Sequence, residues 1–349
     1  MRAFVITAPG RCEVQEVPAP HPAPGQVIVD VERAGVCGTD TELFTGNMAY
    51  LASGDATYPL RIGHEWCGRV SEVGDDVDPS WLGLRVTGDT MLGCRACHLC
   101  RTGRQHLCVQ RFEIGVRGGW PGALAEQLSV PVTALVPLPD SVDEVRGALV
   151  EPGGNALRTV QGAQVQSGSR LLVIGPGTIG LLVAQIARAH GVQVHLVGRS
   201  QYSRDFAHSL GFEQVSALEQ ARDTSQHTLG GVDVDDGFDA VVDASNDPGV
   251  PSLAAELVAP GGRVVLVGLS GEPSLLDTRK LALKDVTAVG VLSASGGLQG
   301  TVDLYASGRV DPRPLVAATV GLDAVADVLA GTRPVGAGPG PKIHVDPRR

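Results

Sequence analysis

The feature that most constrains this fold is an uncharged stretch of 17 residues, Leu171 to Ala187. Its length approaches that of a membrane-spanning helix. Gly175, Pro176 and Gly177 interrupt it in the middle, however, and a helix through Gly-Pro-Gly would lose hydrogen bonds and gain strain. We therefore interpret the stretch as a buried strand, a tight turn and a buried helix, and expect no membrane span.

The surrounding sequence continues this alternation of strand and helix. LLVIG, GLLVAQIARAHG and VQVHLVG supply strand, helix and strand in the length of one βαβ unit. FDAVVDAS, the helical PSLAAELVAPG and GRVVLVGL repeat the pattern. It predicts a doubly wound parallel sheet with helices on both faces. The polar, acidic segment 223–237 is expected to be a surface loop.

The first part of the chain has a different pattern of apolar residues. Between residues 27 and 136, alternating apolar residues are cut by Gly, Pro and Asp, as in VIVDVERAG and GRVSEVG, which indicates short antiparallel strands of a barrel-like domain. The pattern changes again after Thr287, and the chain ends on a short strand, PKIHVDP. We predict an α/β protein in which a β-rich domain (1–155 and 290–349) is interrupted by a nucleotide-binding domain (156–289).

The net charge and the clustered cysteines indicate what kinds of partner the protein binds and in which cellular compartment it works. A net charge of −10, 4% aromatic residues and the lack of a Lys/Arg cluster argue against nucleic acid or an anionic membrane, and favour a small-molecule substrate. The start, MRAFVITAPG, has no signal or transit peptide pattern, so we expect a cytoplasmic protein. In that compartment, clustered cysteines favour a metal over disulfides.

Four of the seven cysteines lie within 15 positions, with spacing C-x2-C-x2-C-x7-C. Structural zinc is held tetrahedrally by four such thiolates. An iron–sulfur cluster or reduced cysteines packed as small apolar groups are the alternatives, although polar neighbours argue against the second. His98 and His106 could replace a thiolate, but because four thiolates complete the set we expect both to be surface histidines. The predicted ligands are Cys94, Cys97, Cys100 and Cys108.

A second group has the chemistry of a catalytic metal site. Cys37 lies in GVCGTD, His64 and Glu65 lie in IGHEWCG, and Glu151 lies in LVEPGG. Catalytic zinc takes soft and nitrogen ligands together with a carboxylate or water, and keeps one position open. Taken alone, each of these residues is more often structural.

The glycine turn predicts a dinucleotide site. GPGTIG lies between a strand and a helix, so its glycines allow a tight turn, approach of the backbone to a pyrophosphate and close helix packing. The expected contacts are Gly175, Gly177, Thr178, Ile179 and Gly180.

The end of the next strand predicts which cofactor is used. It ends at Gly198, where an acidic residue would bind the ribose 2′-hydroxyl, and Arg199, Ser200 and Arg204 follow. Without an acid a 2′-phosphate is not repelled, and Arg can pair with it. We predict NADP in preference to NAD. The alternative is that Arg199 is only a solvated surface residue.

The chain resembles the zinc-containing medium-chain alcohol dehydrogenases over nearly its whole length. The resemblance rests on the order of its motifs, which are CGTD, GHE, the four-cysteine segment 94–108 (the cysteine lobe), EP and GxGxxG. The polyol, threonine and cyclitol dehydrogenase branch is the most similar. The resemblance implies a GroES-like catalytic domain, a Rossmann domain, one structural and one catalytic zinc, and hydride transfer between NADP(H) and a polar secondary alcohol or ketone. It implies that Cys37 and His64 ligate the catalytic zinc, that Glu151 does so directly or through water, and that Glu65 is a ligand or close partner. A homo-oligomer, dimer or tetramer, is expected.

Two positions depart from that family pattern. The branch commonly carries a histidine of the proton relay five residues after the zinc cysteine, and here that residue is Glu42. Thr39 resembles the hydroxyl that starts the relay, and Glu42 is the candidate next member, with a salt-bridged surface carboxylate as the alternative. The EP motif continues with Gly153 and Gly154, which suggests a roomier pocket or a closer approach of the cofactor.

Two other functions remain open at this point. One is a zinc-free reductase of quinones or activated double bonds, although the intact Cys37, His64 and Glu151 argue against it. The other is a non-catalytic, nucleotide-binding redox sensor, in which the cysteine lobe is a switch. Metal content distinguishes them. Asn47, Tyr50 and Trp120 lie in segments that could line a polar pocket.

Overall fold

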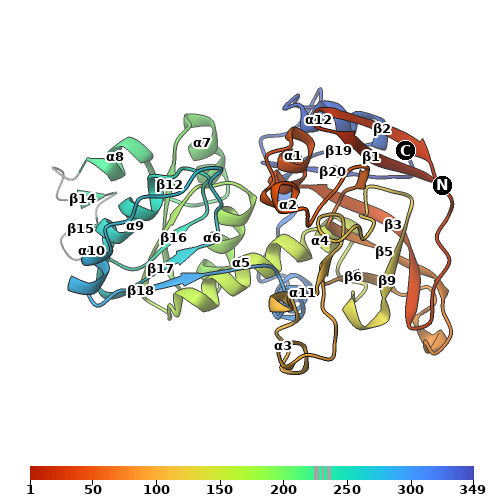
Figure 1. Ribbon diagram of the computed structural model, residues 1–349. Coiled ribbons are helices and arrows are strands. Elements are labelled where there is room, and N and C mark those ends of the chain that lie inside the picture. Colours follow the sequence, from red (N-terminus) through yellow and green to blue (C-terminus); the bar gives the residue numbers. More distant parts are fainter. Residues whose placement is uncertain (224–227, 230–231, 234–236) are drawn as a thin grey trace. The chain divides into compact units, whose positions relative to one another are not determined.

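The computed structural model describes residues 1–223, 228–229, 232–233 and 237–349. The chain divides into two compact units, each with its own apolar core: unit 1 comprises residues 1–154 and 293–349, and unit 2 comprises residues 155–292. The first and last segments of the chain therefore share one unit (Figure 1). The segment 223–237, expected to be a surface loop, lies largely outside the described residues.

The main sheet of unit 1 is organised around β3 (Gln26–Val36). This strand pairs antiparallel with β5 (Glu65–Val73), β9 (Gln127–Pro131) and β20 (Lys342–Val345), and its apolar side chains enter the core. The sheet runs in the order β10-β6-β5-β3-β20-β19, and β9 pairs with β3 beside this path. Its remaining strands are β6 (Arg85–Gly88), β10 (Leu135–Pro137) and β19 (Val316–Val320).

Smaller elements complete unit 1. A second sheet has the order β2-β1-β4, and β7 pairs with β8. Short helices before residue 142, which the sequence did not predict, carry several candidate site residues. The elements are β1 (Arg2–Ala8), β2 (Arg11–Glu16), β4 (Leu60–Arg61), β7 (Met91–Leu92), β8 (Phe112–Glu113), α1 (Gly38–Thr45), α2 (Ala49–Ser53), α3 (His98–Arg101), α4 (Glu144–Ala148), α11 (Leu298–Ala306), α12 (Val325–Leu329), and the 3₁₀ turns η1 (Pro79–Trp81), η2 (Gln105–Leu107), η3 (Val132–Ala134), η4 (Arg313–Leu315) and η5 (Leu322–Ala324).

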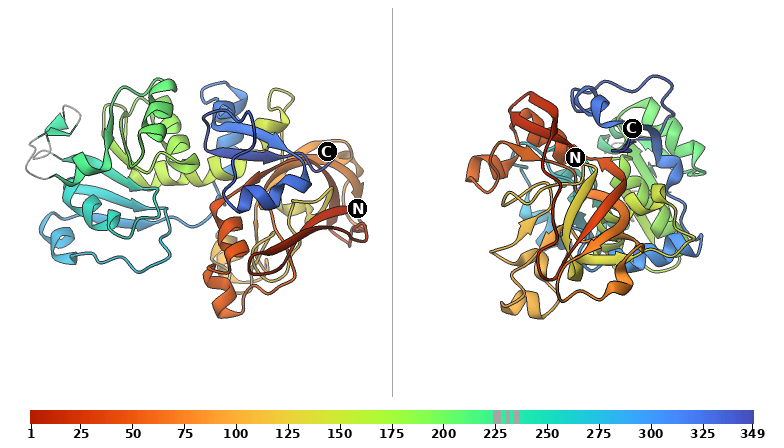
Figure 2. Two further views of the ribbon diagram at one scale, coloured as in Figure 1. Left: turned by 90° about the horizontal axis from the view of Figure 1, so that it is seen from above. Right: turned by 90° about the vertical axis from the view of Figure 1, so that its right-hand side faces the viewer.

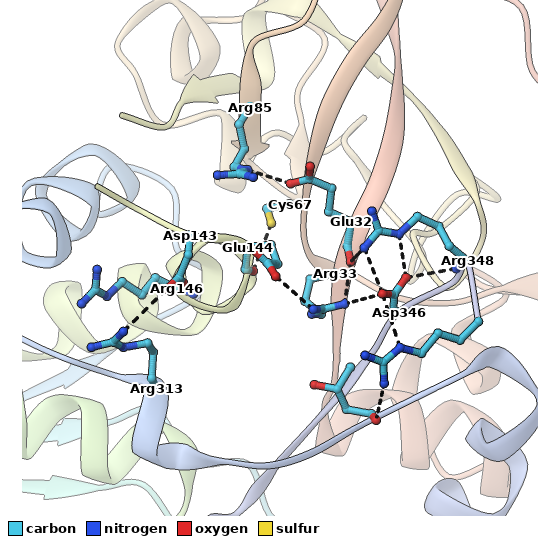
Figure 3. Close-up of polar contacts among 12 residues, drawn as sticks. Glu32, Arg33, Cys67, Arg85, Asp143, Glu144, Arg146, Arg313, Asp346 and Arg348 are labelled. Carbon is cyan, nitrogen blue, oxygen red and sulfur yellow. Dashed lines mark hydrogen bonds and ion pairs between the residues drawn. The ribbon is translucent and has the colours of Figure 1, made fainter. Parts of the chain in front are cut away.

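Ion pairs fasten the end of the chain to β3. The buried Arg33 bonds to Glu144 of α4 at 3.1 Å and to Asp346 at 2.7 Å, and Arg348 bonds to Asp346 at 2.8 Å (Figure 3). The two chain ends also lie close together (Figure 2), where the Arg2 guanidinium donates to the carbonyl of Arg349 at 3.1 Å. The last segment is thereby held in the unit that the first segment builds.

Unit 2 confirms the predicted doubly wound sheet. The strands of this sheet all pair parallel, in the order β13-β12-β11-β16-β17-β18, which is the order of a dinucleotide-binding sheet. The short strands β14 and β15 form a separate antiparallel pair. Helices lie alongside the strands (Figure 1), and α5 (Val150–Ala163) continues into this unit from unit 1. The elements are β11 (Arg170–Ile174), α6 (Thr178–Ala189), β12 (Gln193–Gly198), α7 (Gln201–Ser209), β13 (Val215–Ala217), α8 (Leu218–Arg222), β14 (Thr228–Leu229), β15 (Val232–Asp233), β16 (Phe238–Asp243), α9 (Val250–Leu257), β17 (Val258–Leu266), α10 (Thr278–Leu283) and β18 (Thr287–Gly290).

The uncharged stretch is divided between β11 and α6 by the Gly-Pro-Gly turn, as the sequence predicted. Among the described residues, no helix has both the length and the apolar character that crossing a membrane requires.

Candidate functional site

The four predicted cysteines come together in unit 1. Cys94 follows β7, Cys97 caps α3, Cys100 lies in α3 and Cys108 follows η2. The sulfur atoms of Cys94 and Cys100 are 4.0 Å apart, and those of Cys97 and Cys108 are 3.9 Å apart. Tetrahedral zinc with Zn–S bonds of about 2.3 Å implies sulfur separations of about 3.8 Å. All four thiols are free, so the group fits a metal without rearrangement.

The thiols of this lobe are not equivalent. Hydrogen bonds from the backbone N–H groups of Cys97 and Ala96 lower the pKa of Cys94 to about 6, while burial raises the pKa of Cys100 to about 12. Neither His98 nor His106 belongs to the four-sulfur group. His98 is exposed, but the expectation of a surface residue is wrong for His106, which is buried in η2.

A second donor group joins Cys37, His64 and Glu65, whose ligand atoms lie within 4.8 Å of one another. Strand pairing explains how residues 27 positions apart meet. Cys37 directly follows β3, His64 directly precedes β5, and Gly35 of β3 lies opposite Glu65 of β5. A Cβ atom at Gly35 would clash with the Glu65 carboxylate, so glycine at this position makes room for it.

Asp40 contacts two residues of this donor group, Cys37 and His64, and it is not among the residues that the sequence motifs single out. It is fully buried in the first turn of α1, where its Oδ2 accepts a hydrogen bond from the Cys37 N–H at 2.8 Å. Its Oδ1 lies 3.5 Å from Nδ1 of His64, which leaves Nε2 of the ring available to a metal ion. Burial lowers the pKa of His64, but the charge of Asp40, followed by Cys37, raises it well above its usual value overall. The available signal was the Asp of CGTD.

Lys342 is the counter-ion of Glu65. Its Nζ lies 2.7 Å from both carboxylate oxygens and 3.0 Å from the carbonyl of Val36. Burial lowers the pKa of Lys342, but the charges of Glu65 and Cys37 raise it overall. Because Lys342 is in β20, 277 positions from Glu65, no local pattern pointed to it.

Glu151 is buried in the first turn of α5 and lies outside the group formed by Cys37, His64 and Glu65. The glycine that follows its proline has a packing role. A Cβ atom at Gly153 would clash with the hydroxyl of Tyr305 in α11, and that hydroxyl donates to the carbonyl of Leu149 at 3.1 Å. The space beside Gly153 is therefore filled by Tyr305, contrary to the suggestion of a roomier pocket.

The two relay candidates lie one turn apart on α1, which Cys37 caps. Thr39 and Glu42 are both half-buried. Burial raises the pKa of Glu42. Among the described residues Glu42 has no ion pair, so the alternative of a salt-bridged surface carboxylate does not fit.

Tyr50, which lies in α2, and Trp120 have defined hydrogen-bond partners. Tyr50 donates to Glu113 at 3.0 Å and accepts from Arg111 at 3.0 Å. The Trp120 indole donates to the carbonyl of Ser129 at 3.0 Å, which turns its polar edge to β9. Asn47 is exposed. Two of these three side chains thus have structural hydrogen bonds within unit 1.

The glycine turn of unit 2 fits a dinucleotide. Gly175 directly follows β11 and has a φ of +102°, and Gly177 caps α6 with open space where a side chain would begin. A Cβ atom at Gly180 would clash with the carbonyl of Gly175, so α6 packs closely on the turn. Thr178 and Ile179 form the first turn of α6, whose free N–H groups attract phosphate.

A cavity of about 630 Å³ lies within unit 2, at the carboxyl ends of β16, β17 and β18. Parallel sheets of this order bind dinucleotides at that edge. Asp243, Ser245 and Asp247 contribute polar groups to the lining, and Leu266, Leu269 and Val291 contribute apolar groups.

The three residues predicted to contact the 2′-position of the cofactor's ribose differ in their own contacts. The Ser200 hydroxyl caps α7 by accepting from the N–H of Ser203 at 3.2 Å. Arg204 donates to the carbonyls of Gly198 and Arg199, both at 3.0 Å, so its guanidinium is bound to the backbone at the end of β12. Arg199 is exposed, with 66% of its side chain accessible, and it pairs with Asp247.

Known proteins share both units with this chain. Residues 23–140 match the alcohol dehydrogenase GroES-like domain, and residues 178–307 match the zinc-binding dehydrogenase domain. An L-threonine 3-dehydrogenase from Saccharopolyspora erythraea is 34% identical over 294 residues, which cover 83% of each chain.

Two solved structures extend the likeness to nearly the full length. A zinc-binding dehydrogenase from Sinorhizobium meliloti bound to NADP is 30% identical, with a TM-score of 0.88 and 99% of each chain covered. An alcohol dehydrogenase from Escherichia coli in complex with NADH is 25% identical, with a TM-score of 0.89 and the same coverage. The chain therefore belongs to the zinc-containing medium-chain alcohol dehydrogenase superfamily, and it is an alcohol dehydrogenase.

Proposed function

We propose that this alcohol dehydrogenase is zinc-dependent and NADP-linked, and that it interconverts a polar secondary alcohol and its ketone. The observation that carries the proposal is the donor group of Cys37, His64 and Glu65, with ligand atoms within 4.8 Å of one another. Thiolate, imidazole and carboxylate together are typical of a catalytic zinc. The four-cysteine group leaves no open position, so its proposed zinc is structural.

The catalytic role divides among residues of unit 1. Zinc, when bound, polarises the oxygen of the substrate and makes its deprotonation easier near neutral pH. Cys37 and His64 hold the ion, and Asp40 keeps the imidazole in its ligating orientation. Glu65 is a ligand or an immediate partner whose charge Lys342 balances. Glu151 is the further carboxylate, acting directly or through water.

The proposed proton path follows α1. The Thr39 hydroxyl accepts the proton of the substrate alcohol while passing its own proton to Glu42, from which it reaches solvent. Burial raises the pKa of Glu42, which brings this base closer to a neutral operating pH. NADP, when bound, would supply the nicotinamide ring that accepts the hydride of the carbinol carbon.

The proposed cofactor is NADP because of the end of β12. Gly198 offers no carboxylate to the ribose, and the exposed Arg199 can meet a 2′-phosphate. Related structures have been solved with NADP and with NADH. Steady-state kinetics with both cofactors test this: we expect higher catalytic efficiency with NADP, and a loss of that preference in Arg199→Ala.

The proposed substrate class is a polyol, cyclitol, sugar or amino alcohol. A relative is named for the 3-position of L-threonine, whose hydroxyl is secondary. The decisive experiment is a screen of NADP-linked activity over polyols, cyclitols, amino sugars and 3-hydroxy amino acids, with metal analysis of the same preparation. Two zinc ions per chain support the dehydrogenase. One zinc favours the non-catalytic sensor, and none favours the zinc-free reductase.

The proposed division of labour gives residues 1–155 and 290–349 the zinc chemistry and residues 156–289 the cofactor. We further propose a cytoplasmic homo-oligomer, dimer or tetramer, which light scattering of the purified protein tests.

A further inference from the structure

Two arginines converge on one carboxylate oxygen in unit 2. Nη2 of Arg199 lies 2.9 Å from Oδ2 of Asp247, and Nη2 of Arg222 lies 2.8 Å from the same oxygen. The two guanidinium nitrogens are therefore at most 5.7 Å apart. The three residues come from separate segments: Arg199 follows β12, Arg222 ends α8, and Asp247 follows β16.

Asp247 is the fixed member of this cluster. Its side chain is only 15% accessible, and its Oδ1 accepts a hydrogen bond from the N–H of Gly249 at 2.8 Å. That bond, together with Arg222 and Arg199, lowers the pKa of Asp247, so the group is a carboxylate at neutral pH. Asp247 also lines the cavity at the carboxyl edge of the sheet. The arginine pair therefore meets the edge where a dinucleotide binds.

The arginines are the movable members, and their charge exceeds what Asp247 can balance. The side chains of Arg199 and Arg222 are 66% and 46% accessible. Two guanidinium groups facing one carboxylate leave one positive charge in excess. A phosphate monoester carries about −1.5 to −2 charges and three acceptor oxygens at pH 7. It can accept from both guanidinium groups at once and balance both charges.

We propose that Arg199 and Arg222 together bind the 2′-phosphate of NADP, and that Asp247 holds both guanidinium groups in place until the phosphate replaces it. The inference rests on the proposed NADP preference and adds two residues to it. Asp247 competes with the phosphate for the same nitrogens, and its charge repels the incoming anion. Arg222 is a specificity-determining residue that no motif indicated, because it lies in a different segment from the glycine turn.

Titration calorimetry of the full-length, zinc-loaded protein tests this without relying on turnover. The probes are 2′,5′-ADP, which carries the 2′-phosphate, and 5′-AMP, which lacks it. Arg222→Gln should weaken binding of 2′,5′-ADP about tenfold, since a charge-assisted phosphate contact is lost. Binding of 5′-AMP should not change, which also shows that the variant is folded. Arg222→Lys should recover part of the loss.

Two further variants complete the experiment. Asp247→Asn should strengthen 2′,5′-ADP binding about threefold, the scale of an exposed ion pair that no longer competes. Arg279→Gln is the matched control, because Arg279 is an exposed arginine of the same unit paired with Asp277 at 2.8 Å. It loses the same charge and should leave the affinities for both probes unchanged.

The outcomes separate this inference from the proposed function. If the wild type prefers 2′,5′-ADP and Arg199→Gln abolishes the preference, but Arg222→Gln leaves it intact, the two-arginine site is refuted and the NADP assignment survives. Weaker 2′,5′-ADP binding in Asp247→Asn would contradict the competing role of Asp247. Equal affinity of the wild type for the two probes would overturn the NADP proposal and this inference with it.

Discussion

Replacing Lys342 by methionine should expose how strongly the candidate catalytic site depends on internal charge balance. The side chain of Lys342 is 4% accessible and that of Glu65 is 1% accessible, and Nζ lies 2.7 Å from both carboxylate oxygens. Methionine preserves most of the volume but leaves the Glu65 carboxylate buried without its counter-ion. The carbonyl of Val36 loses a donor as well.

The expected loss is large because the pair is buried. Removing one partner of a buried ion pair costs about 3–5 kcal/mol of unfolding free energy. For a unit of about 200 residues, each kcal/mol lowers the unfolding midpoint by about 2–4 °C, so the metal-free variant should unfold about 6–20 °C below the wild type. Zinc supplies positive charge beside Glu65. The deficit should therefore shrink when zinc is present.

Scanning calorimetry of chelator-treated and zinc-loaded protein measures both quantities. Lys280→Met is the control, because Lys280 pairs with Glu256 while its side chain remains 40% accessible, and an exposed pair contributes at most about 1 kcal/mol. The double variant Glu65→Gln/Lys342→Met should recover much of the loss, since it leaves no unpaired charge. A metal-free Lys342→Met protein within 1 °C of the wild type would refute the reasoning.

Three further changes test other parts of the molecule. In Gly93→Ala the new Cβ would lie 2.6 Å from the sulfur of Cys100. The zinc content measured by mass spectrometry should therefore fall from two ions per chain toward one. Gly271→Ala is the control, because it adds a Cβ at an open position and should keep both ions. Burial lowers the pKa of His195 to about 4. The free energy of unfolding should therefore be highest above pH 6.5 and should fall by about 1.4 kcal/mol per pH unit as the pH drops from 6.5 toward 4, because only the unfolded chain takes up the proton. Denaturant titrations of His195→Gln should lack this dependence. Glu42→Gln should remove an ionisation from the acid limb of the pH–rate profile, and an unchanged profile would exclude Glu42 from the relay.

The parallel sheet and its glycine turn could be predicted because their signals are local. An uncharged run broken by Gly175, Pro176 and Gly177 permits few structures, and the parallel direction of the strands follows from repeated βαβ units. The short helices of unit 1 escaped prediction for the converse reason. Helix α1 has only eight residues, too few for a clear apolar period, and its start is fixed by hydrogen bonding between Cys37 and Asp40.

The same distinction separates the site residues that were found from those that were missed. The spacing of the cysteines predicts the four-sulfur group, because its members lie close together in the sequence. Arg222 and Asp247 meet Arg199 only because the end of α8 and the segments that follow β12 and β16 converge at one edge of the sheet. Gly153 was misread because its neighbour, Tyr305, is more than a hundred residues away. Partners of this kind follow from tertiary packing, which a motif does not encode.

Charge balance connects the missed residues to the proposed metal. The Cys37 thiolate, Asp40 and Glu65 would place three negative charges in a largely buried space, and Lys342 supplies one positive charge. Burial of uncompensated charge is costly, so such a site must either take up protons or hold a cation. With His64 neutral, a divalent ion balances the charges of these four side chains, and Glu151, the further proposed carboxylate, would add one negative charge. Zinc binding should therefore release protons from the site.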